Sequence, residues 1–267
     1  MKKKLILASA LSLSLALAAC NGNDDKENGG TDATEGLETN IVTIATGGAS
    51  GPYNIIGTTL ADQYVKEFDV NSRTQTTGAS VENINLLEQG KAEMAFVMSD
   101  ALSQAINGEV SFNEPIKNVS QIATLYPNVV QIITKEGSGI NTIEDLKGKR
   151  IAVGDQNSGV EINARVLLNG HGITYEDVKV DYLGYAEAAD GLKAGTIDAA
   201  FLTSGLPNAS VMELAETTGI QLVSVNADKV AEIAKEHPYF ISYDIAVDTY
   251  KNEEAITTAA VPNALVV

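Results

Sequence analysis

Four loops of the sequence combine glycine, hydroxyl and other small polar residues in a way that suits the binding of a small molecule. They cover residues 46–53, 99–100, 154–161 and 203–208, and each follows an apolar run that predicts a strand. Open α/β sheets bind their ligands at the carboxyl ends of strands. The first and third loops precede predicted helices, whose positive ends and exposed backbone N–H groups can hold a carboxylate without a buried arginine. We therefore expect a site for a small anion or zwitterion.

The candidate ligand-binding residues share small or hydrogen-bonding side chains. They are Thr46, Gly47, Gly48, Ser50, Gly51, Tyr53, Ser99, Asp100, Tyr126, Asn157, Ser158, Gly159 and Ser204. We expect Tyr53 to pack on the ligand and Asp100 to accept a hydrogen bond from an ammonium group. Each candidate has a structural alternative: the glycines can serve tight turns with positive φ, the tyrosines can pack in the core, and Asp100 can cap a helix at Ala101.

No catalytic or metal centre is indicated by the sequence. His171 lies in a helix-ending turn and His237 precedes a proline, so neither belongs to a recognisable nucleophile motif. The glycine-rich segment 47–51 is not followed by the Lys and Ser or Thr of a phosphate-binding P-loop. One Cys and two His leave too few ligands for a zinc site, and a structural metal would need oxygen ligands. We expect no metal, no cofactor and no enzymatic activity.

The charge balance excludes nucleic acid as a partner. The 267 residues include 18 Lys and Arg against 35 Asp and Glu, which gives a formal net charge of −17. Proteins bind polyphosphate backbones mainly through Lys and Arg. The hydrophobic fraction of 44% suits a folded globular protein, and the length allows one large domain or two lobes.

The N-terminus predicts export and lipid anchoring. Residues 1–19 combine three lysines, a short apolar run and small residues, which is typical of a signal peptide. The segment Leu17-Ala18-Ala19-Cys20 resembles a bacterial lipobox, which implies cleavage before Cys20 and lipidation of its sulfur. Residues 20–40 are polar and predict a flexible tether. We expect an extracytoplasmic protein that is lipid-anchored to the cell membrane.

Regular structure is predicted from residue 41 onward in an α/β order. A β-branched run at 41–45 predicts a strand, and residues 52–67 have the periodicity of a helix. A helix near 80–89 and a buried strand at 92–98 follow. A similar sequence pattern recurs 105 residues later, and this constant shift aligns Glu82 with Glu187.

The internal repeat predicts two similar lobes with a ligand cleft between them. We expect residues 41–132 to form the first part of lobe 1, residues 133–225 to form lobe 2, and residues 226–267 to return to lobe 1. The extended, β-branched run 119–135 is the hinge candidate. Two crossings between the lobes permit closure around a cleft.

Five segments of the chain stand in an order that is specific to one family. They are Thr46-Gly47-Gly48-Ala49-Ser50-Gly51-Pro52-Tyr53, Thr77-Gly78-Ala79-Ser80-Val81-Glu82-Asn83, Leu125-Tyr126-Pro127, Asn157-Ser158-Gly159-Val160-Glu161-Ile162-Asn163-Ala164 and Phe201-Leu202-Thr203-Ser204-Gly205-Leu206-Pro207. Together they resemble the TAXI family of substrate-binding receptors for TRAP transporters. The resemblance implies an α/β fold of the two-lobed periplasmic-binding-protein type (type II, Venus-flytrap). It also implies a receptor that captures a small carboxylated solute, such as glutamate, glutamine or a related organic acid, and delivers it to membrane permease subunits.

Two features depart from the family pattern. Val160 stands where the family often has Thr, and the chain stops at Val267 where the family continues through further helices. The resemblance therefore implies a fold that is truncated at the C-terminus. Two alternatives remain: a lipoprotein that senses a solute or binds another protein, and an enzyme on the same scaffold.

Overall fold

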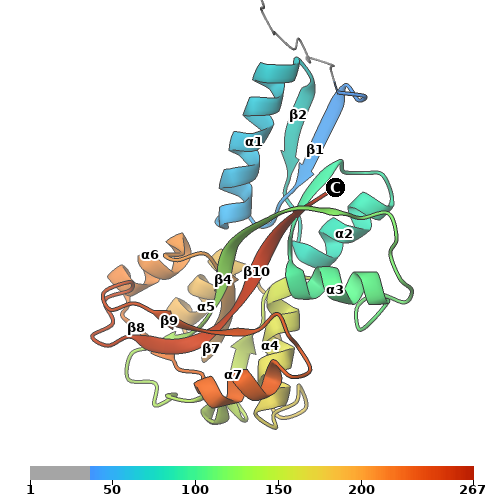
Figure 1. Ribbon diagram of the computed structural model, residues 1–267. Coiled ribbons are helices and arrows are strands. Elements are labelled where there is room, and N and C mark those ends of the chain that lie inside the picture. Colours follow the sequence, from blue (N-terminus) through green and yellow to red (C-terminus); the bar gives the residue numbers. More distant parts are fainter. Residues whose placement is uncertain (1–36) are drawn as a thin grey trace, which may run out of the picture. The chain divides into compact units, whose positions relative to one another are not determined.

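The described part of the computed structural model runs from residue 37 to residue 267 and alternates strands with helices (Figure 1). The predicted signal peptide, the lipidation site Cys20 and most of the predicted tether lie outside these residues. Across residues 37–267, no helix combines the length and the apolar character that crossing a bilayer requires.

The first half of the fold, residues 41–107, packs three helices against three parallel strands. Its elements in chain order are β1 (Ile41–Ala45), α1 (Pro52–Phe68), β2 (Asn71–Gln75), α2 (Ser80–Glu88), β3 (Met94–Met98) and α3 (Ser99–Asn107). The strand β1 lies between β2 and β3. Pro52 stands at the first position of α1, where its missing N–H costs no helical hydrogen bond. The strand predicted at 41–45 and the helix predicted at 52–67 are thus confirmed.

The second half, residues 143–245, repeats this arrangement. Its elements are the short 3₁₀ helix η1 (Ile143–Leu146), β5 (Arg150–Ala152), α4 (Gly159–Gly170), β6 (Lys179–Asp181), α5 (Tyr185–Ala194), β7 (Ala199–Ser204), α6 (Ala209–Thr217), β8 (Ile220–Val223), α7 (Ala227–Ile233) and β9 (Ile241–Ile245). Here β5 lies between β6 and β7, as β1 lies between β2 and β3. The predicted shift of 105 residues relates the two halves: α2 begins at Ser80 and α5 at Tyr185, and β3 begins at Met94 and β7 at Ala199.

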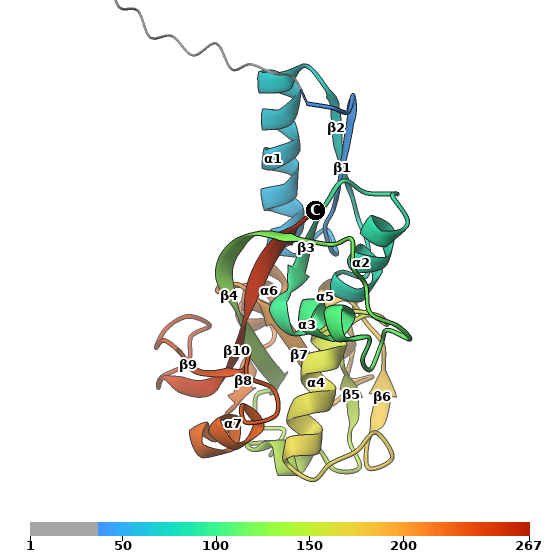
Figure 2. The ribbon, with the colours of Figure 1, turned by 45° about the vertical axis from the view of Figure 1, so that its right-hand side comes forward.

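Two long strands join the halves into one sheet (Figure 2). They are β4 (Gln121–Lys135), which covers most of the predicted hinge run, and β10 (Ile256–Val266). The last residues of β10 pair with β3 and its first residues pair with β9. The strand β4 pairs with β10 along one part and with β7 and β8 along the other. The resulting order is β2-β1-β3-β10-β4-β7-β5-β6.

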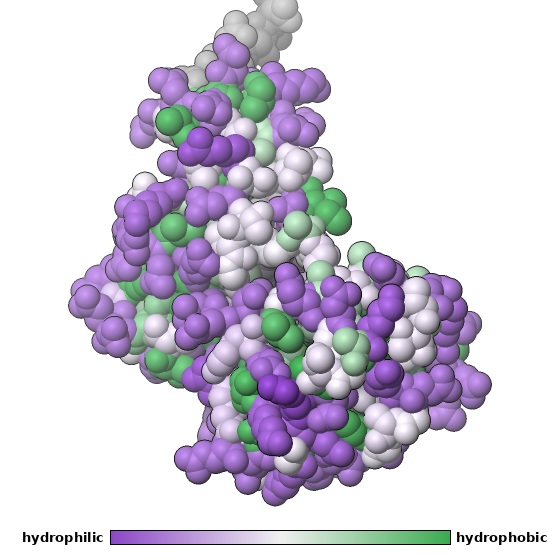
Figure 3. Space-filling view, turned by 180° about the vertical axis from the view of Figure 1, so that it is seen from behind, coloured by the Kyte–Doolittle hydropathy of each residue, from purple (hydrophilic) through white to green (hydrophobic). Residues whose placement is uncertain are grey.

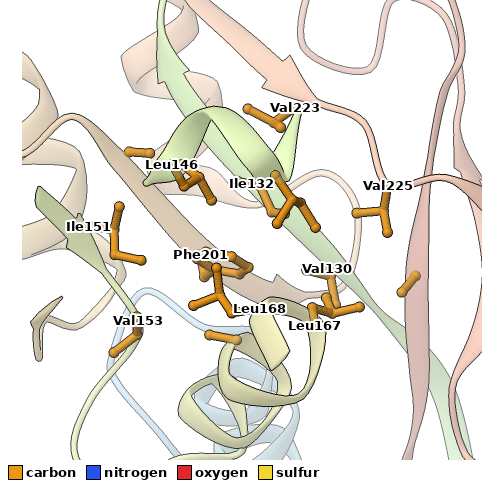
Figure 4. Packing of buried hydrophobic residues seen from close by; sticks show 14 of the residues in the cluster. Val130, Ile132, Leu146, Ile151, Val153, Leu167, Leu168, Phe201, Val223 and Val225 are labelled. Carbon is orange, nitrogen blue, oxygen red and sulfur yellow. The ribbon is translucent and has the colours of Figure 1, made fainter. Parts of the chain in front are cut away.

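Each half has its own apolar interior. In the second half, Val130, Ile132, Leu167, Leu168 and Phe201 are almost fully buried and come from β4, α4 and β7 (Figure 4). Another cluster, around Ile84 and Val97, fills the space between α2, α3 and β3. The two clusters also touch each other, because Met98 of β3 belongs to the first and Ile162 of α4 belongs to the second. The residue boundaries predicted for the two lobes stay a prediction.

Candidate functional site

A cleft lies where loops from both halves meet β4. It holds about 500 Å³ of empty space, part of which is open to solvent. The residues that line it are Gly47, Gly48, Gly51, Pro52, Tyr53, Gly78, Ala79, Met98, Tyr126, Asn128, Asp155, Ser158, Val160, Tyr185, Thr203 and Ser204. Seen from behind, the surface is indented between the part that carries α1 and the part that carries α5 and α6, and mostly hydrophilic side chains cover the rest of this face (Figure 3).

The structure brings seven of the candidate residues together in this cleft. They are Gly47, Gly48, Gly51, Tyr53, Tyr126, Ser158 and Ser204. All lie at carboxyl ends of strands, at the start of a helix or on β4, as the sequence predicts for ligand loops. Ser50 lines an adjoining hollow, which we call the mouth. Its lining residues are Gly48, Ala49, Ser50, Thr76, Thr77, Gly78, Asp155, Gln156, Tyr182, Gly184, Tyr185, Ala186 and Glu187.

Five other candidates do not line the cleft or its mouth: Thr46, Ser99, Asp100, Asn157 and Gly159. The Thr46 hydroxyl donates to the backbone oxygen of Gln75 over 3.1 Å. Asn157 is exposed and has a φ of 63°.

Asp100 binds protein groups instead of the cleft. Its Oδ1 accepts from the N–H of Ala101, as the helix-capping alternative proposed, and its Oδ2 accepts from Asn163 Nδ2 at 2.5 Å. Burial raises its pKa from 3.8 to about 7, which the hydrogen bonds from Ala101, its own backbone and Asn163 oppose. The contact joins α3 of the first half to α4 of the second.

The four candidate glycines do not serve turns with a positive φ, and one of them allows a close approach between elements. None of Gly47, Gly48, Gly51 and Gly159 has a positive φ, so the turn alternative is wrong for these four positions. A Cβ on Gly159 would come within 2.7 Å of Met98 Sδ, because the start of α4 packs directly on the end of β3. A Cβ on Gly48 would meet no atom within 4 Å. The backbone at Gly48 is therefore open to a bound molecule.

Asn83, from α2, holds two of the cleft loops in place. Its side chain is fully buried, and its Nδ2 donates to the backbone oxygens of Thr46 and Phe96 at 2.6 and 2.7 Å. Its Oδ1 accepts from the Thr77 hydroxyl at 2.6 Å. One side chain thus ties the loop after β1, the loop before α2 and the strand β3 together.

A second buried network fixes Tyr53 at the base of the cleft. The Tyr53 hydroxyl donates to Asn263 Oδ1, which also accepts from Asn128 Nδ2 at 2.6 Å. The Tyr53 ring stacks on Phe96 with the ring centroids 5.3 Å apart. Tyr53 is therefore both a packing residue, as its structural alternative proposed, and a lining residue.

Three polar atoms of the cleft residues are buried without a hydrogen-bond partner. They are the Tyr126 hydroxyl, Asn128 Oδ1 and Thr203 Oγ1. Asn128 is 2% exposed and Thr203 is 1% exposed. Buried polar atoms in native proteins nearly always have a partner, and an unmade hydrogen bond is costly. The three residues that carry these atoms line the same cavity.

The charge of the cleft is negative. Asp155 is the only charged residue that lines it, and no Lys, Arg or His does so among residues 37–267. Burial raises the pKa of Asp155 above 3.8, and the nearby carboxylates of Glu187 and Glu82 raise it further. Burial also raises the pKa values of Tyr126 and Tyr185 above 10.0, so both hydroxyls remain neutral.

The sequence reasoning missed several of these residues, and a signal existed for some of them. Asp155 belongs to the third candidate loop, residues 154–161, but it is not among the predicted ligand-binding residues. The shift of 105 residues carries Ser80 onto Tyr185, so the repeat itself pointed to the start of α5. No local pattern marks Asn128 or Thr203, because their positions depend on strand pairing.

The two serine hydroxyls at the cleft are held by other groups of the protein. The Ser158 hydroxyl accepts from the N–H of Glu161 as a helix cap, and the Ser204 hydroxyl accepts from Asn208 Nδ2. Within residues 37–267, no three His, Cys, Asp or Glu side chains are grouped so that they could hold a metal ion. The arrangement suits binding through hydrogen bonds and aromatic contact.

Known structures share this fold. The alkanesulfonate-binding protein SsuA from Xanthomonas axonopodis pv. citri, bound to MOPS, superposes with a TM-score of 0.53 at 18% identity, over 70% of this chain and 61% of that one. PhnD1 from Prochlorococcus marinus, in complex with methylphosphonate, gives 0.56 at 12% identity, over 85% and 76% of the two chains. An ancestral arginine-binding protein bound to arginine gives 0.53 at 16% identity, over 86% and 84%.

These similarities and the cleft define the class: the protein has the two-lobed fold of periplasmic solute-binding proteins, as the sequence predicts. Residues 44–267 match the NMT1-like family, and the chain belongs to that family. The chain spans less than two thirds of the length of SsuA, at 61%.

Proposed function

We propose that this protein is an extracytoplasmic solute receptor that captures a small carboxylated solute in the cleft and delivers it to a membrane permease. The observation that carries the proposal is the group of three unpaired, buried polar atoms on Tyr126, Asn128 and Thr203 around one cavity. A hydroxyl donor and two acceptors in a mostly apolar pocket are typical of a site that fixes the orientation of a small polar ligand.

The first loop supplies groups that suit a carboxylate. No hydrogen bond within residues 37–267 uses the N–H groups of Gly47 and Gly48, and the loop leads into the N-terminus of α1. Free N–H groups beside a helix N-terminus favour an anion. Glutamate, glutamine and related organic acids are the solutes that the TAXI resemblance implies.

Transport is the biological role we propose, with a TRAP-type permease as the partner and a lipid anchor at Cys20. Family membership supports a solute-binding protein, and the resemblance of five segments supports the TRAP system. A lipoprotein that senses a solute with the same cleft is the second candidate. An enzyme on this scaffold is disfavoured, because the serines at the cleft are held by helix caps and side-chain amides.

A thermal-shift screen of the natural mature protein against amino acids, keto acids and dicarboxylates tests the proposal. A ligand at about 100 times its Kd stabilises its receptor by roughly 2.7 kcal/mol, which raises the melting temperature measurably. The bound solute should be recovered chemically unchanged. No shift with any of these acids would contradict a receptor for small carboxylates, and turnover of the ligand would favour an enzyme.

Replacing Tyr126 by Phe removes one unpaired hydroxyl and keeps the ring. We expect the Kd for the solute found in the screen to rise by about fivefold, since one hydrogen bond contributes about 1 kcal/mol. Tyr239→Phe is the matched control, because Tyr239 is 37% exposed and lies outside the cleft. Equal affinity in both variants, measured by calorimetry, would remove Tyr126 from the site.

A further inference from the structure

We infer that Asp155 binds a cationic group of the solute, so that the receptor selects solutes that are net neutral or positive and rejects those with a second negative charge. The inference rests on the proposed receptor function and narrows its substrate class from carboxylated solutes in general to zwitterions and cations.

Asp155 lies where a ligand passes from the mouth into the cleft. It lines both hollows, together with Gly48, Gly78 and Tyr185. The side chain is half-buried, yet its carboxylate accepts no hydrogen bond from any of residues 37–267. Only its backbone oxygen is used, by the N–H of Ser158 at 3.2 Å. This carboxylate is partly withdrawn from water and has no protein donor, so the site favours a donor or a positive charge from a bound molecule.

Two further carboxylates flank Asp155, and they occupy equivalent positions in the repeat. Glu82 lies in the first turn of α2, and Glu187 lies in the first turn of α5. An atom at the Cβ position of Gly184 would be 2.7 Å from Glu187 Oε2 and 3.3 Å from Asp155 Oδ2, so both carboxylates lie beside this glycine. Glu82 Oε2 accepts from the N–H of Gly78 at 2.7 Å, which keeps that carboxylate at the same loop.

No cationic side chain at the site balances this negative charge. Neither the cleft nor its mouth is lined by a Lys, Arg or His among the described residues. Like charges at close range oppose ionisation and attract a cation, and the effect is strong where burial lowers the dielectric constant. Burial raises the pKa of Asp155, and the neighbouring carboxylates of Glu187 and Glu82 raise it further.

The remaining lining residues suit an ammonium group. The rings of Tyr53, Tyr126 and Tyr185 line the cleft, and the negative face of an aromatic ring attracts cations. The unpaired Asn128 Oδ1 and Thr203 Oγ1 can accept from two of the three N–H donors of an ammonium. One carboxylate can still be held at the N–H groups of Gly47 and Gly48. A second carboxylate of the solute would lie near the carboxylates of Asp155, Glu82 and Glu187 and would be repelled by them.

Isothermal titration of the natural mature protein with four probes tests the inference. The probes are 2-oxoglutarate, L-glutamate, L-glutamine and L-arginine, which run from doubly negative to positive at neutral pH. We expect L-glutamine to bind at least about tenfold more tightly than L-glutamate, and 2-oxoglutarate to bind most weakly, because each added negative charge faces uncompensated carboxylates.

The variant Asp155→Asn separates charge from shape. We expect it to reduce the preference for L-glutamine over L-glutamate by at least about fivefold, since the amide keeps the size but removes the charge. Asp62→Asn, on the exposed side of α1, is the control and should leave the preference unchanged. The melting temperature of each variant without ligand shows that it is folded.

The outcomes distinguish the inference from the function on which it rests. Equal or tighter binding of L-glutamate or 2-oxoglutarate would overturn the charge selection and leave the receptor for carboxylates standing. A preference that survives Asp155→Asn unchanged would also overturn the role of Asp155. Binding of none of the four probes would contradict both the inference and the proposed carboxylate receptor.

Discussion

At the scale of single residues, the geometry of the site depends on buried side chains that hold its loops in place. Asn83 makes hydrogen bonds to Thr46, Phe96 and Thr77, and these contacts fix two loops of the cleft relative to β3. A helical asparagine at the start of α2 looks unremarkable in sequence, because its partners lie on other elements. Its role is to position residues that line the cleft.

Replacing Asn83 by Ala should destabilise the protein by about 3 kcal/mol, because the buried backbone oxygens of Thr46 and Phe96 each lose a donor and the Thr77 hydroxyl loses an acceptor. Urea unfolding followed by circular dichroism measures the change. Asn85→Ala on the same helix is the matched control, since the Asn85 side chain makes no hydrogen bond within the described chain, and it should change stability by less than about 0.5 kcal/mol. Similar losses in the two variants would show that Asn83 has no special structural role.

At the scale of elements, the two halves meet where α3 and α4 begin. Asp100 and Asn163 form a buried hydrogen bond there, and Gly159 lets α4 approach Met98. The Asn163 Oδ1 atom has no partner. A protonated Asp100 can donate to a neighbouring acceptor, whereas an ionised Asp100 holds a buried charge that its hydrogen bonds from Ala101 and Asn163 compensate only in part. The junction between the halves is therefore sensitive to the protonation of one carboxyl.

This junction predicts a pH dependence of stability. The folded-state pKa of Asp100 is about 7, against an ordinary value of 3.8. The folded protein thus keeps the proton over a range in which the unfolded chain has released it, so this group's contribution to stability is lost as the pH rises from about 4 to about 7. The full loss is of the order of 4 kcal/mol.

The variant Asp100→Asn isolates that contribution. We expect its free energy of unfolding, relative to the unaltered protein, to increase steadily between pH 4 and pH 7.5, because the variant has no carboxyl to ionise. Denaturant unfolding at several pH values measures the difference. A difference that stays constant over this range would show that Asp100 ionises at its ordinary pH.

At the scale of the whole fold, β10 pairs with β3 of the first half and with β9 of the second, and β4 pairs with β10 and with β7 and β8 of the second half. The cleft is lined from both halves and from β4, so bending of these two strands changes its width. A ligand drives such closure only through its higher affinity for the closed form.

We expect the solute found in the thermal-shift screen to reduce the radius of gyration of the protein, measured by small-angle X-ray scattering. The reduction should require the binding residues, so Tyr126→Phe should need more solute for the same change. An unchanged radius at saturating solute would show that the cleft binds without closing.

Much of the fold follows from local signals, and most of the site does not. The strand at 41–45, the helix at 52–67 and the repeat of 105 residues are visible in sequence because each rests on periodicity or on the spacing of similar residues. The glycine loop and Tyr53 could be predicted to line the cleft, since ligand loops follow strands. Asn128 and Thr203 could not, because which strand residues face a cavity is set by pairing between distant segments.

The place of β10 in the sheet has a consequence for how the protein is made. This strand follows every other described strand in the chain, yet it lies in the middle of the sheet, between β3 and β4. Until residues 256–266 have been synthesised and are free to insert, the centre of the sheet is open and its edges are unpaired. A chain that is still emerging from a ribosome or a narrow export channel therefore cannot complete its fold, and such long-range pairing forms slowly. The topology therefore delays completion of the sheet until the whole of β10 is available.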